Sequence, residues 1–410
     1  MKVLLGDVVQ VNPESLYKAY QYDQIEYIDI SSVGTGTLLG TTIYDLKDAP
    51  GRAKRIVRDG DTIVAMVRPN LRSFLYIKNP KPNLVVSTGF AVLRPGEKID
   101  SRFLYYTVTD QSFTDYLVSR VRGAAYPAVD TETFKQAEIN LPSLPTQRKI
   151  AAILSAYDDL IENNTRRIKI LEEMAQLIYR DWFVKFRFPG HEKVRMVDSE
   201  LGSIPEGWKV RAIGEVFDTL GGGTPSTKNP EYWVNGTVTW FTPSDLTSSE
   251  TMFVSECAKR ITQKGLEKSS AKIFPAYSVM MTSRATIGVT AINTVPACTN
   301  QGFIVCVPNE LASTYEIYYW INTNKERIEA IASGATYKEI NRTEFRSFLY
   351  VIADSETRKR FNNIIEPLAK QIEGLTKKNL ILRRTRDLLL PKLISGELDV
   401  EDLDIAVGGD

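Results

Sequence analysis

Two long amphipathic segments occur in this chain in the same register, 211 residues apart. The first lies within residues 145–188 and the second within 354–396. Apolar residues recur in both at alternating steps of three and four, which keeps one stripe of a helix against a partner helix. The predicted seam consists of Ile150, Leu154, Tyr157, Ile161, Asn164, Ile168, Leu171, Ile178, Phe361, Ile365, Leu368, Ile372, Leu375, Asn379, Leu382 and Leu389.

Either helix, taken by itself, could simply pack on its own globular domain. Two helices in matching register favour pairing with each other as an antiparallel coiled coil. Asn164 and Asn379 interrupt the apolar stripes. Polar seam residues can fix register and orientation, and they can equally be tolerated defects.

Helix boundaries are indicated by capping residues. Thr146 after Pro145 is the expected start of the first helix, and Asp354 with Ser355 that of the second. We expect the first helix to end at Pro189–Gly190 and the second at Gly396.

The repeat continues outside the helices. "STGFAVLRPG" (87–96) resembles "NQGFIVCVPN" (300–309), and "RGAAYPAVDTETFKQ" (122–136) resembles "SGATYKEINRTEFRS" (333–347). A chain of 410 residues is too long for one core. Strand-like runs such as "DTIVAMV" and a helix-like run over 102–120 occur without strict alternation, which predicts the α+β class. The predicted parts are domain 1–144, helix 145–188, linker 189–205, domain 206–353, helix 354–396 and acidic tail 397–410.

The sequence contains few residues that suggest a catalytic site. The one histidine, His191, lies in the predicted linker, and no GxxxxGK[ST] phosphate loop is present. An Asp/Asn-Pro-Pro-aromatic run, which amino-methylating DNA methyltransferases would be expected to show, is also missing. Cys257, Cys298 and Cys306 lack metal-ligand spacing, so we expect buried thiols, no metal and no bound cofactor. A nuclease site built from carboxylates that are scattered along the sequence remains an open alternative.

Polar, glycine-punctuated and basic loops stand out instead. Net charge is only +1, yet residues 51–72 hold six Arg or Lys against two Asp, so a neutral total can hide a basic face. "GGGTPSTKN", "TSRATIG", "TNQGF" and "SGATYKEI" suit phosphate contacts and base reading, although each alone could be an ordinary turn. The candidate DNA-binding residues are Arg68, Asn70, Arg72, Ser87, Thr88, Arg120, Arg122, Tyr126, Thr224, Ser226, Lys228, Ser283, Arg284, Thr286, Asn300, Gln301, Tyr337 and Lys338.

In these motifs the chain resembles the specificity subunits of type I restriction–modification systems. The junction "LPSLPTQRKIAAILSAYDDLIENNTRRIKILEEMAQLIYRDWFVKFRF" is similar to the central region of that family. "LGSIPEGWKV", "GGGTPST", "SRATIG", "TNQGF" and "RRTRDLLLPKLISGELDV" also resemble its signatures. The resemblance covers the whole chain. "GGTPS" and "RATIG" have no clear equivalents in the first domain.

The resemblance implies a non-catalytic DNA-recognition subunit with two target-recognition domains, each reading one half of a bipartite, asymmetric sequence. It implies two methyltransferase subunits as partners, and two restriction subunits can join. S-adenosylmethionine and ATP would belong to those partners. No apolar run suits a membrane span, and we expect a cytoplasmic protein. The alternatives are a stand-alone enzyme that cleaves or methylates DNA and a coiled-coil scaffold without DNA contact.

Overall fold

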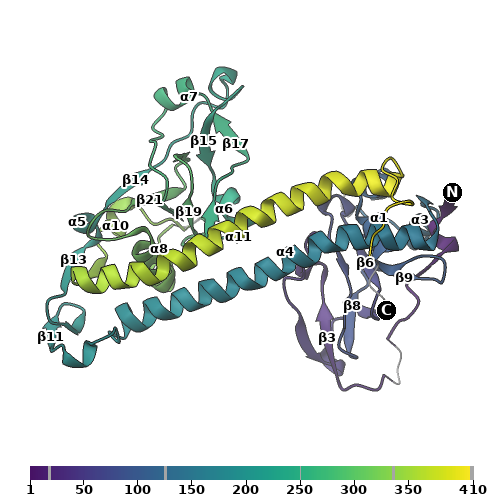
Figure 1. The fold of residues 1–410 in the computed structure, drawn as a ribbon, viewed down its shortest axis with the longest axis horizontal. Helices are drawn as coiled ribbons and strands as arrows, with labels where there is room; N and C mark the ends of the chain where they lie inside the picture. The colour runs from purple at the N-terminus through teal and green to yellow at the C-terminus, as the bar shows by residue number, and fades with distance from the viewer. Residues whose placement is uncertain (17–19, 124–126, 250, 335–337, 407–410) are drawn as a thin grey trace. The chain divides into compact units, whose positions relative to one another are not determined.

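The computed structural model describes residues 1–16, 20–123, 127–249, 251–334 and 338–406. It divides into two compact units, Met1–Glu162 with Leu380–Asp410 and Asn163–Asn379. Two long helices, α4 (Leu144–Tyr179) and α11 (Ser355–Ser395), each contribute to both units (Figure 1). The remaining elements mix short helices with mostly antiparallel sheets, so the predicted α+β class is confirmed.

The first unit contains two four-stranded sheets. One has the order β2 (Val9–Val11), β9 (Phe90–Pro95), β6 (Thr62–Ala65) and β7 (Phe74–Tyr76). The other has the order β4 (Thr42–Asp45), β3 (Gln24–Ile28), β8 (Leu84–Ser87) and β5 (Ala53–Ile56). The short helices are α1 (Ser101–Thr109), α2 (Gln111–Val118) and α3 (Thr131–Lys135).

The second unit repeats this plan. Its larger sheet has the order β14 (Asp218–Gly221), β21 (Phe303–Val307), β18 (Val279–Thr282), β19 (Thr290–Asn293) and β16 (Phe253–Val254). Its smaller sheet has the order β17 (Lys259–Ile261), β15 (Val238–Phe241) and β20 (Cys298–Thr299). The short helices are α5 (Ile213–Val216), α6 (Pro243–Ser249), α7 (Gln263–Glu267), α8 (Thr314–Thr323), α9 (Lys325–Ile331) and α10 (Arg342–Arg346).

Strand pairing shows that the two domains are structural copies. In each, a central antiparallel pair, β6–β9 or β18–β21, carries further antiparallel strands on both sides. In each, the second sheet contains a parallel pair, β3–β8 or β15–β20. The internal sequence repeat therefore reflects a repeated fold.

Each domain begins and ends on one antiparallel pair of strands. In the first unit, β1 (Lys2–Leu4) pairs with β10 (Glu138–Asn140), so Lys2 lies opposite Asn140. In the second, β13 (Lys209–Ala212) pairs with β22 (Leu349–Ile352), so Lys209 lies opposite Ile352. Because the two ends of each domain are joined by a ladder, each long helix that follows leaves from a fixed point.

Both ends of the first long helix differ from the sequence-based predictions. The start of α4 is capped by Ser143 rather than Thr146, because the Ser143 hydroxyl accepts the Thr146 N–H at 3.4 Å and Pro145 occupies the first turn. The helix does not reach Pro189: it ends at Tyr179 and continues as a π-helical turn, Arg180–Val184, which turns Trp182 into the core.

The predicted linker and the predicted helix over 102–120 also need correction. Within 189–205, β11 (Met196–Ser199) and β12 (Gly202–Pro205) form a hairpin, and His191 is exposed in the short turn that precedes it. The helix over 102–120 is broken at Asp110, whose carboxylate accepts the Ser112 N–H at 2.9 Å and caps a new helix. Asp354 and Gly396 bound α11 as predicted.

The two long helices contact each other within each unit, and in the second unit they run antiparallel. There Asn164 Nδ2 donates to Asn379 Oδ1 at 2.9 Å, and the Tyr179 ring lies 5.9 Å from that of Phe361. In the first unit, Asp158 of α4 forms an ion pair with Arg386 of α11. Every predicted seam residue is buried or half-buried, whereas a supercoil of the helices stays a prediction.

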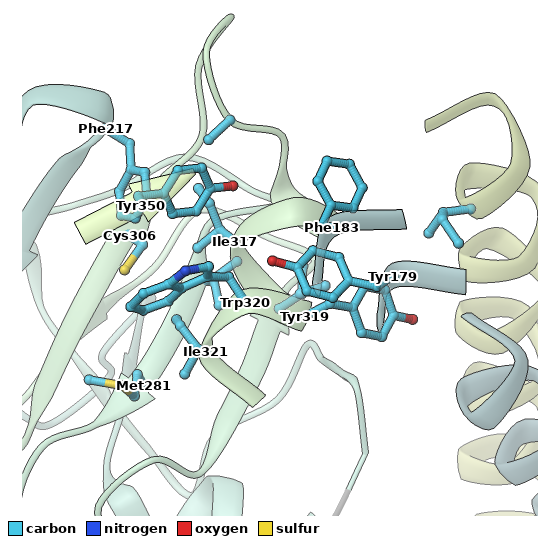
Figure 2. Close-up of a cluster of buried hydrophobic side chains, with 14 of the residues drawn as sticks. Tyr179, Phe183, Phe217, Met281, Cys306, Ile317, Tyr319, Trp320, Ile321 and Tyr350 are labelled. Atoms are coloured by element: carbon cyan, nitrogen blue, oxygen red, sulfur yellow. The ribbon is translucent and has the colours of Figure 1, made fainter. Parts of the chain in front are cut away.

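The core of the second domain is continuous with the helix seam (Figure 2). Tyr179 stacks on Phe183 at 5.0 Å between ring centroids and lies 5.9 Å from Tyr319 of α8. Further into the domain, Trp320 packs 5.8 Å from Tyr350 of β22. Helix and domain therefore share one apolar cluster. None of the described helices is long and apolar enough to cross a membrane.

The buried Asn164–Asn379 pair predicts a distinctive mutational pattern. Asn164→Ala leaves the Asn379 side chain without one of its hydrogen bonds and should cost about 1–3 kcal/mol, seen as a lower urea-unfolding midpoint. The double change to leucine should recover most of that loss, because apolar packing replaces both polar groups.

The exposed neighbour Asn163 is the matched control, and its alanine variant should stay within about 0.5 kcal/mol of the parent. An Asn164→Ala protein as stable as the parent would show that the pair contributes nothing to the helix contact.

Candidate nucleic-acid interface

A hollow of about 360 Å³ in the second domain brings together residues that are distant in sequence. Its walls come from three segments: the start of α6, residues 284–286 after β18, and residues 300–302 before β21. Arg284, Asn300 and Gln301, all predicted as DNA-contacting, line it together. The contribution of α6 was missed from sequence, although strand-like "VTWF" followed by "TPSD" is typical of a strand that leads into a helix start.

Backbone hydrogen bonds hold these loops in place. The Ser283 N–H donates to the Gly302 carbonyl at 2.8 Å, and the Ile340 N–H donates to the Ser283 carbonyl at 3.0 Å. Two residues after Ser283, Ala285 has φ +59°, a left-handed conformation that is uncommon for alanine. Its N–H donates to the Lys338 carbonyl at 3.1 Å. A left-handed residue at the rim of the hollow is thus fixed by its surroundings.

The side chains of the hollow are oriented by polar contacts. Arg284 Nε lies 2.7 Å from Glu339 Oε1, and both side chains are partly exposed. Asn300 Oδ1 accepts the Gly302 N–H at 2.9 Å, while Gln301 Oε1 accepts the Thr224 hydroxyl at 2.6 Å. An amide oxygen has two lone pairs and its nitrogen two hydrogens, so each amide keeps capacity for a base edge.

The other predicted residues of the second domain are distributed around this hollow and elsewhere. Thr286 lines it, and Lys338 is exposed next to Glu339. Ser226 and Lys228 are exposed in the loop that contains Thr224. Ser283 is only 3% exposed, so its side chain cannot reach a ligand, and that prediction is corrected. Tyr337 lies outside the described residues.

The first domain contains the same backbone arrangement, at a position that the sequence did not reveal. The Met66 N–H donates to the Gly89 carbonyl at 2.8 Å, and the Val129 N–H donates to the Met66 carbonyl at 2.9 Å. The Arg68 N–H donates to the Pro127 carbonyl at 2.8 Å, and Arg68 has φ +48°. Arg68 therefore occupies the place that Ala285 has in the second domain.

This match supplies the equivalent of "RATIG" that sequence comparison could not find. The offset between the two loops is 217 residues, because Arg68 matches Ala285, whereas Gly89 matches Gly302 at an offset of 213. A shift of four residues between neighbouring matches hides the repeat from a fixed-offset comparison. The arginine lies one position later in the first domain than in the second.

The candidate residues of the first domain differ in accessibility. Arg68 and Asn70 are exposed, and Thr88 is half-buried. Ser87 is completely buried, and its hydroxyl accepts the Gly89 N–H at 3.3 Å, so the prediction that it contacts DNA is corrected.

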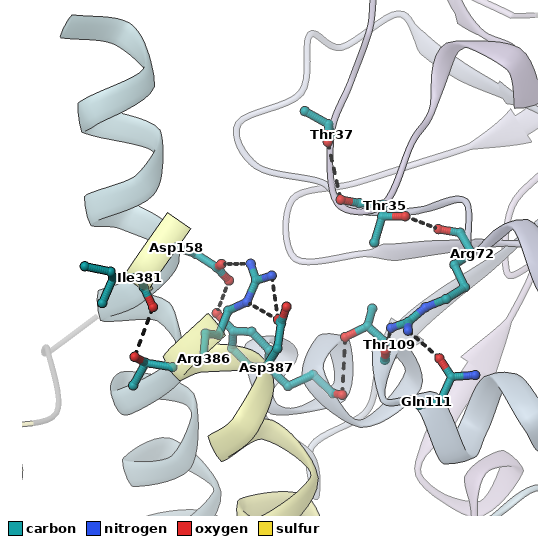
Figure 3. A network of polar contacts seen from close by, with 11 residues as sticks. Thr35, Thr37, Arg72, Thr109, Gln111, Asp158, Ile381, Arg386 and Asp387 are labelled. Carbon is teal, nitrogen blue, oxygen red and sulfur yellow. Dashed lines mark hydrogen bonds and ion pairs between the residues drawn. The ribbon is translucent and has the colours of Figure 1, made fainter. Parts of the chain in front are cut away.

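Arg72 is engaged in a network within the protein (Figure 3). Its Nη2 donates to the Thr109 carbonyl at 2.8 Å, and its Nη1 donates to Gln111. Its own carbonyl accepts the Thr35 hydroxyl at 3.2 Å. Arg72 thus ties the loop after β6 to the helices α1 and α2, and its predicted contact with DNA stays a prediction.

Within the first unit, α1 is attached to both long helices by polar contacts. Tyr106 of α1 donates to Asp158 Oδ2 at 2.6 Å, and Asp158 forms an ion pair with Arg386 of α11. Burial and the neighbouring carboxylate raise the pKa of Tyr106 far above its ordinary value, so the phenol keeps its proton and remains a donor.

Arg120 and Arg122 are exposed near the end of α2. The Arg120 guanidinium lies 3.7 Å from the centroid of the Tyr116 ring, and Arg122 Nη1 lies 3.7 Å from Asp130 Oδ2. Tyr126 lies outside the described residues. Both arginines are accessible, and their predicted DNA contacts stay predictions.

The cysteines match the expectation of buried thiols in two cases out of three. Cys298 and Cys306 are buried, and Cys257 is half-buried. Burial raises the pKa of Cys298 to about 12, which keeps this thiol protonated and unreactive. Among the described residues, no group of three or more His, Cys, Asp or Glu is placed to hold a metal ion.

Comparison with known proteins agrees with this architecture. A family model described as the type I restriction modification DNA specificity domain matches residues 1–173 and 205–383. The HindI specificity subunit of Haemophilus influenzae is 24% identical, over 96% of this chain and 98% of that protein. The MjaIX specificity subunit of Methanocaldococcus jannaschii is 26% identical, over 97% of this chain and 88% of that protein.

A solved structure shows the same fold. The S subunit of a type I restriction–modification system from M. genitalium has a TM-score of 0.57 and 14% identity, with 96% of each chain covered. Because the family model matches both halves, the chain belongs to the family of type I restriction–modification specificity subunits.

Proposed function

We propose that this chain selects the DNA sequence on which a type I restriction–modification complex acts. The observation that carries the proposal is the pair of matching loop arrangements, around Arg284 in one domain and around Arg68 in the other. The backbone is the same, whereas the side chains that it presents differ. Two copies of one frame with different side chains suit two different half-sites of one asymmetric DNA sequence.

The long helices suit the assembly of the complex. On α4, within the second unit, Ile170, Met174 and Leu177 are 56%, 46% and 63% exposed. Their spacing of four and three residues places them on one face of the helix. Apolar side chains exposed along one helix face are typical of a protein-docking surface. We assign this stripe to contact with a methyltransferase subunit.

Catalysis belongs to the partners in this proposal. S-adenosylmethionine would be bound by two methyltransferase subunits and ATP by restriction subunits, and the complex would act on DNA in the cytoplasm. Recognition needs only that this chain present polar side chains to the grooves of a duplex and basic ones to its phosphates.

Domain exchange tests the proposal directly. Replacing residues 206–353 with the matching segment of a relative keeps the β13–β22 ladder within one source, so both long helices stay unchanged. Methylome sequencing of cells carrying the chimera with its methyltransferase should show a change in one half of the methylated motif only.

The reciprocal exchange of residues 1–141 should change the other half. If either exchange alters both halves, the domains do not read independently, and the assignment of one domain to each half-site is wrong.

Arg284 provides a test within the second half-site. Its ion pair with Glu339 is exposed and contributes little to stability, so Arg284→Ala should fold normally. Loss of a base contact should cost about 1–3 kcal/mol and relax the preference at one base pair. Binding to a set of singly substituted duplexes at fixed salt measures both effects.

Arg327, an exposed arginine of α9, is the matched control, and its alanine variant should bind as the parent does. An Arg284→Ala chain that retains both affinity and discrimination would remove this residue from the interface.

The competing possibility, a stand-alone DNA enzyme, makes a different prediction. The purified chain, incubated with DNA, S-adenosylmethionine and magnesium, should neither methylate nor cleave, whereas added methyltransferase subunits should restore methylation. Replacing Met174 and Leu177 with glutamate should abolish that methylation and co-purification while leaving DNA binding intact, since charged side chains oppose burial. Methylation or cleavage by the pure chain would refute the proposal.

A further inference from the structure

The second domain has another hollow, of about 420 Å³, which none of the predicted DNA contacts lines. Its walls are Thr227, Trp233, Ala258, Lys259 and Arg260. It combines an aromatic residue with two consecutive basic residues, which is a common composition of nucleic-acid surfaces. Lys228 is exposed next to Thr227 and adds a third positive charge close to its rim.

The aromatic wall of this hollow is rigid. The Trp233 ring packs edge-on against the buried Trp240, with 5.1 Å between centroids, and Trp233 Nε1 donates to the Ser226 carbonyl at 3.1 Å. Lys259 and Arg260 belong to β17, whose pairing with β15 places Lys259 opposite Trp240. β17 is an edge strand of its sheet, so both cationic side chains reach solvent.

The charges of the hollow are not neutralised by the protein. In the part of the chain that the structure describes, neither Lys259 nor Arg260 has a carboxylate partner, and Arg260 Nη1 makes one weak contact, 3.4 Å, to the Thr237 carbonyl. By contrast, nearby Lys264 is paired with Glu231 at 2.5 Å. Unpaired, exposed and adjacent cations are available to an anionic ligand.

One loop connects this hollow to the one around Arg284. Thr224 donates to Gln301 in the first hollow, Ser226 accepts from Trp233, and Thr227 lines the second hollow. The segment of residues 224–228 therefore borders both. A ligand that spans both hollows would therefore contact this loop.

The matching positions of the first domain, both among the described residues, carry no charge. Trp240 and Tyr27 hold the same place in their sheets, because each lies in the strand that makes the parallel pair. The antiparallel neighbour of Trp240 is Lys259, and that of Tyr27 is Thr42. One position further along, Arg260 therefore matches Ile43. Ile43 is 64% exposed and cannot attract an anion. The positive charge at this position is thus a property of the second domain and not of the shared fold.

We propose that Lys259 and Arg260, with Lys228 at the rim, form a site for the phosphodiester backbone of duplex DNA beside the second half-site. This inference rests on the proposed function and adds a sequence-independent contact to it. Lysine on a strand edge acts as a point charge rather than as a reader of base edges, which favours phosphate as the group that is bound.

The test uses the full-length chain with Lys259→Ala and Arg260→Ala combined, and duplexes that carry or lack the target sequence. The slope of log affinity against log salt is negative, and each phosphate contact adds about 0.9 to its magnitude. Loss of the two side chains should therefore make the slope shallower by roughly 1–2. Affinity should fall by a similar factor for target and non-target duplexes, and the ratio between them should persist.

The control is Lys209→Ala with Arg211→Ala, an exposed lysine and arginine of β13, a strand of the same unit that belongs to a different sheet. It should bind with the parental slope. A Lys259/Arg260 variant with the parental slope and affinity would overturn the phosphate site. Loss confined to the target duplex would also overturn it, because it would indicate base reading.

The proposed function fails in a different way. A parent chain without preference for the target duplex would refute the role in sequence selection itself. If the parent chain prefers the target duplex and the Lys259/Arg260 variant binds with the parental affinity and salt dependence, only the phosphate site is refuted. Circular dichroism of both variants should match the parent, since all four residues are exposed.

Discussion

Burial of the apolar stripes of α4 and α11 is the constraint on which the rest of the structure depends. In the second unit the stripe belongs to the same cluster as the domain core, through Tyr179, Tyr319 and Phe361. In the first unit, Leu154 and Leu393 lie in one cluster with Phe103 of α1. Each buried side chain of this kind contributes about 1.5–3 kcal/mol. A domain therefore cannot shift along its helices without exposing its own core.

Polar contacts decide which of the possible apolar packings is adopted. Asn164 opposite Asn379, and Asp158 opposite Arg386, each require one alignment of the helices within their unit. Burial opposes the charge of Arg386, but two neighbouring carboxylates, Asp158 and Asp387, outweigh that effect and hold its pKa above the ordinary value. Such contacts add little net stability, yet a misaligned helix would leave them unsatisfied.

The repeated domain shows how one frame can present different chemistry. In both domains a residue with positive φ is held by hydrogen bonds from segments far away in sequence, so the loop shape survives changes in its side chains. Arg284 and Arg68 occupy neighbouring rather than equivalent positions, and the cations Lys259 and Arg260 have no counterpart in the first domain. Side chains on an edge strand therefore decide which of the two domains carries the additional positive charge.

The amino-acid sequence by itself determined the internal repeat, the register of the two helices, the α+β class and the family. These are properties of local periodicity and motif, which depend on residues near one another in the chain. Only the tertiary structure decided which candidates are accessible: it buried Ser87 and Ser283 and tied Arg72 to Thr109. It also matched Arg68 with Ala285 and gathered Trp233, Lys259 and Arg260 around one hollow. Burial and convergence arise from pairing between distant strands, and no pattern along one segment records which strands will meet.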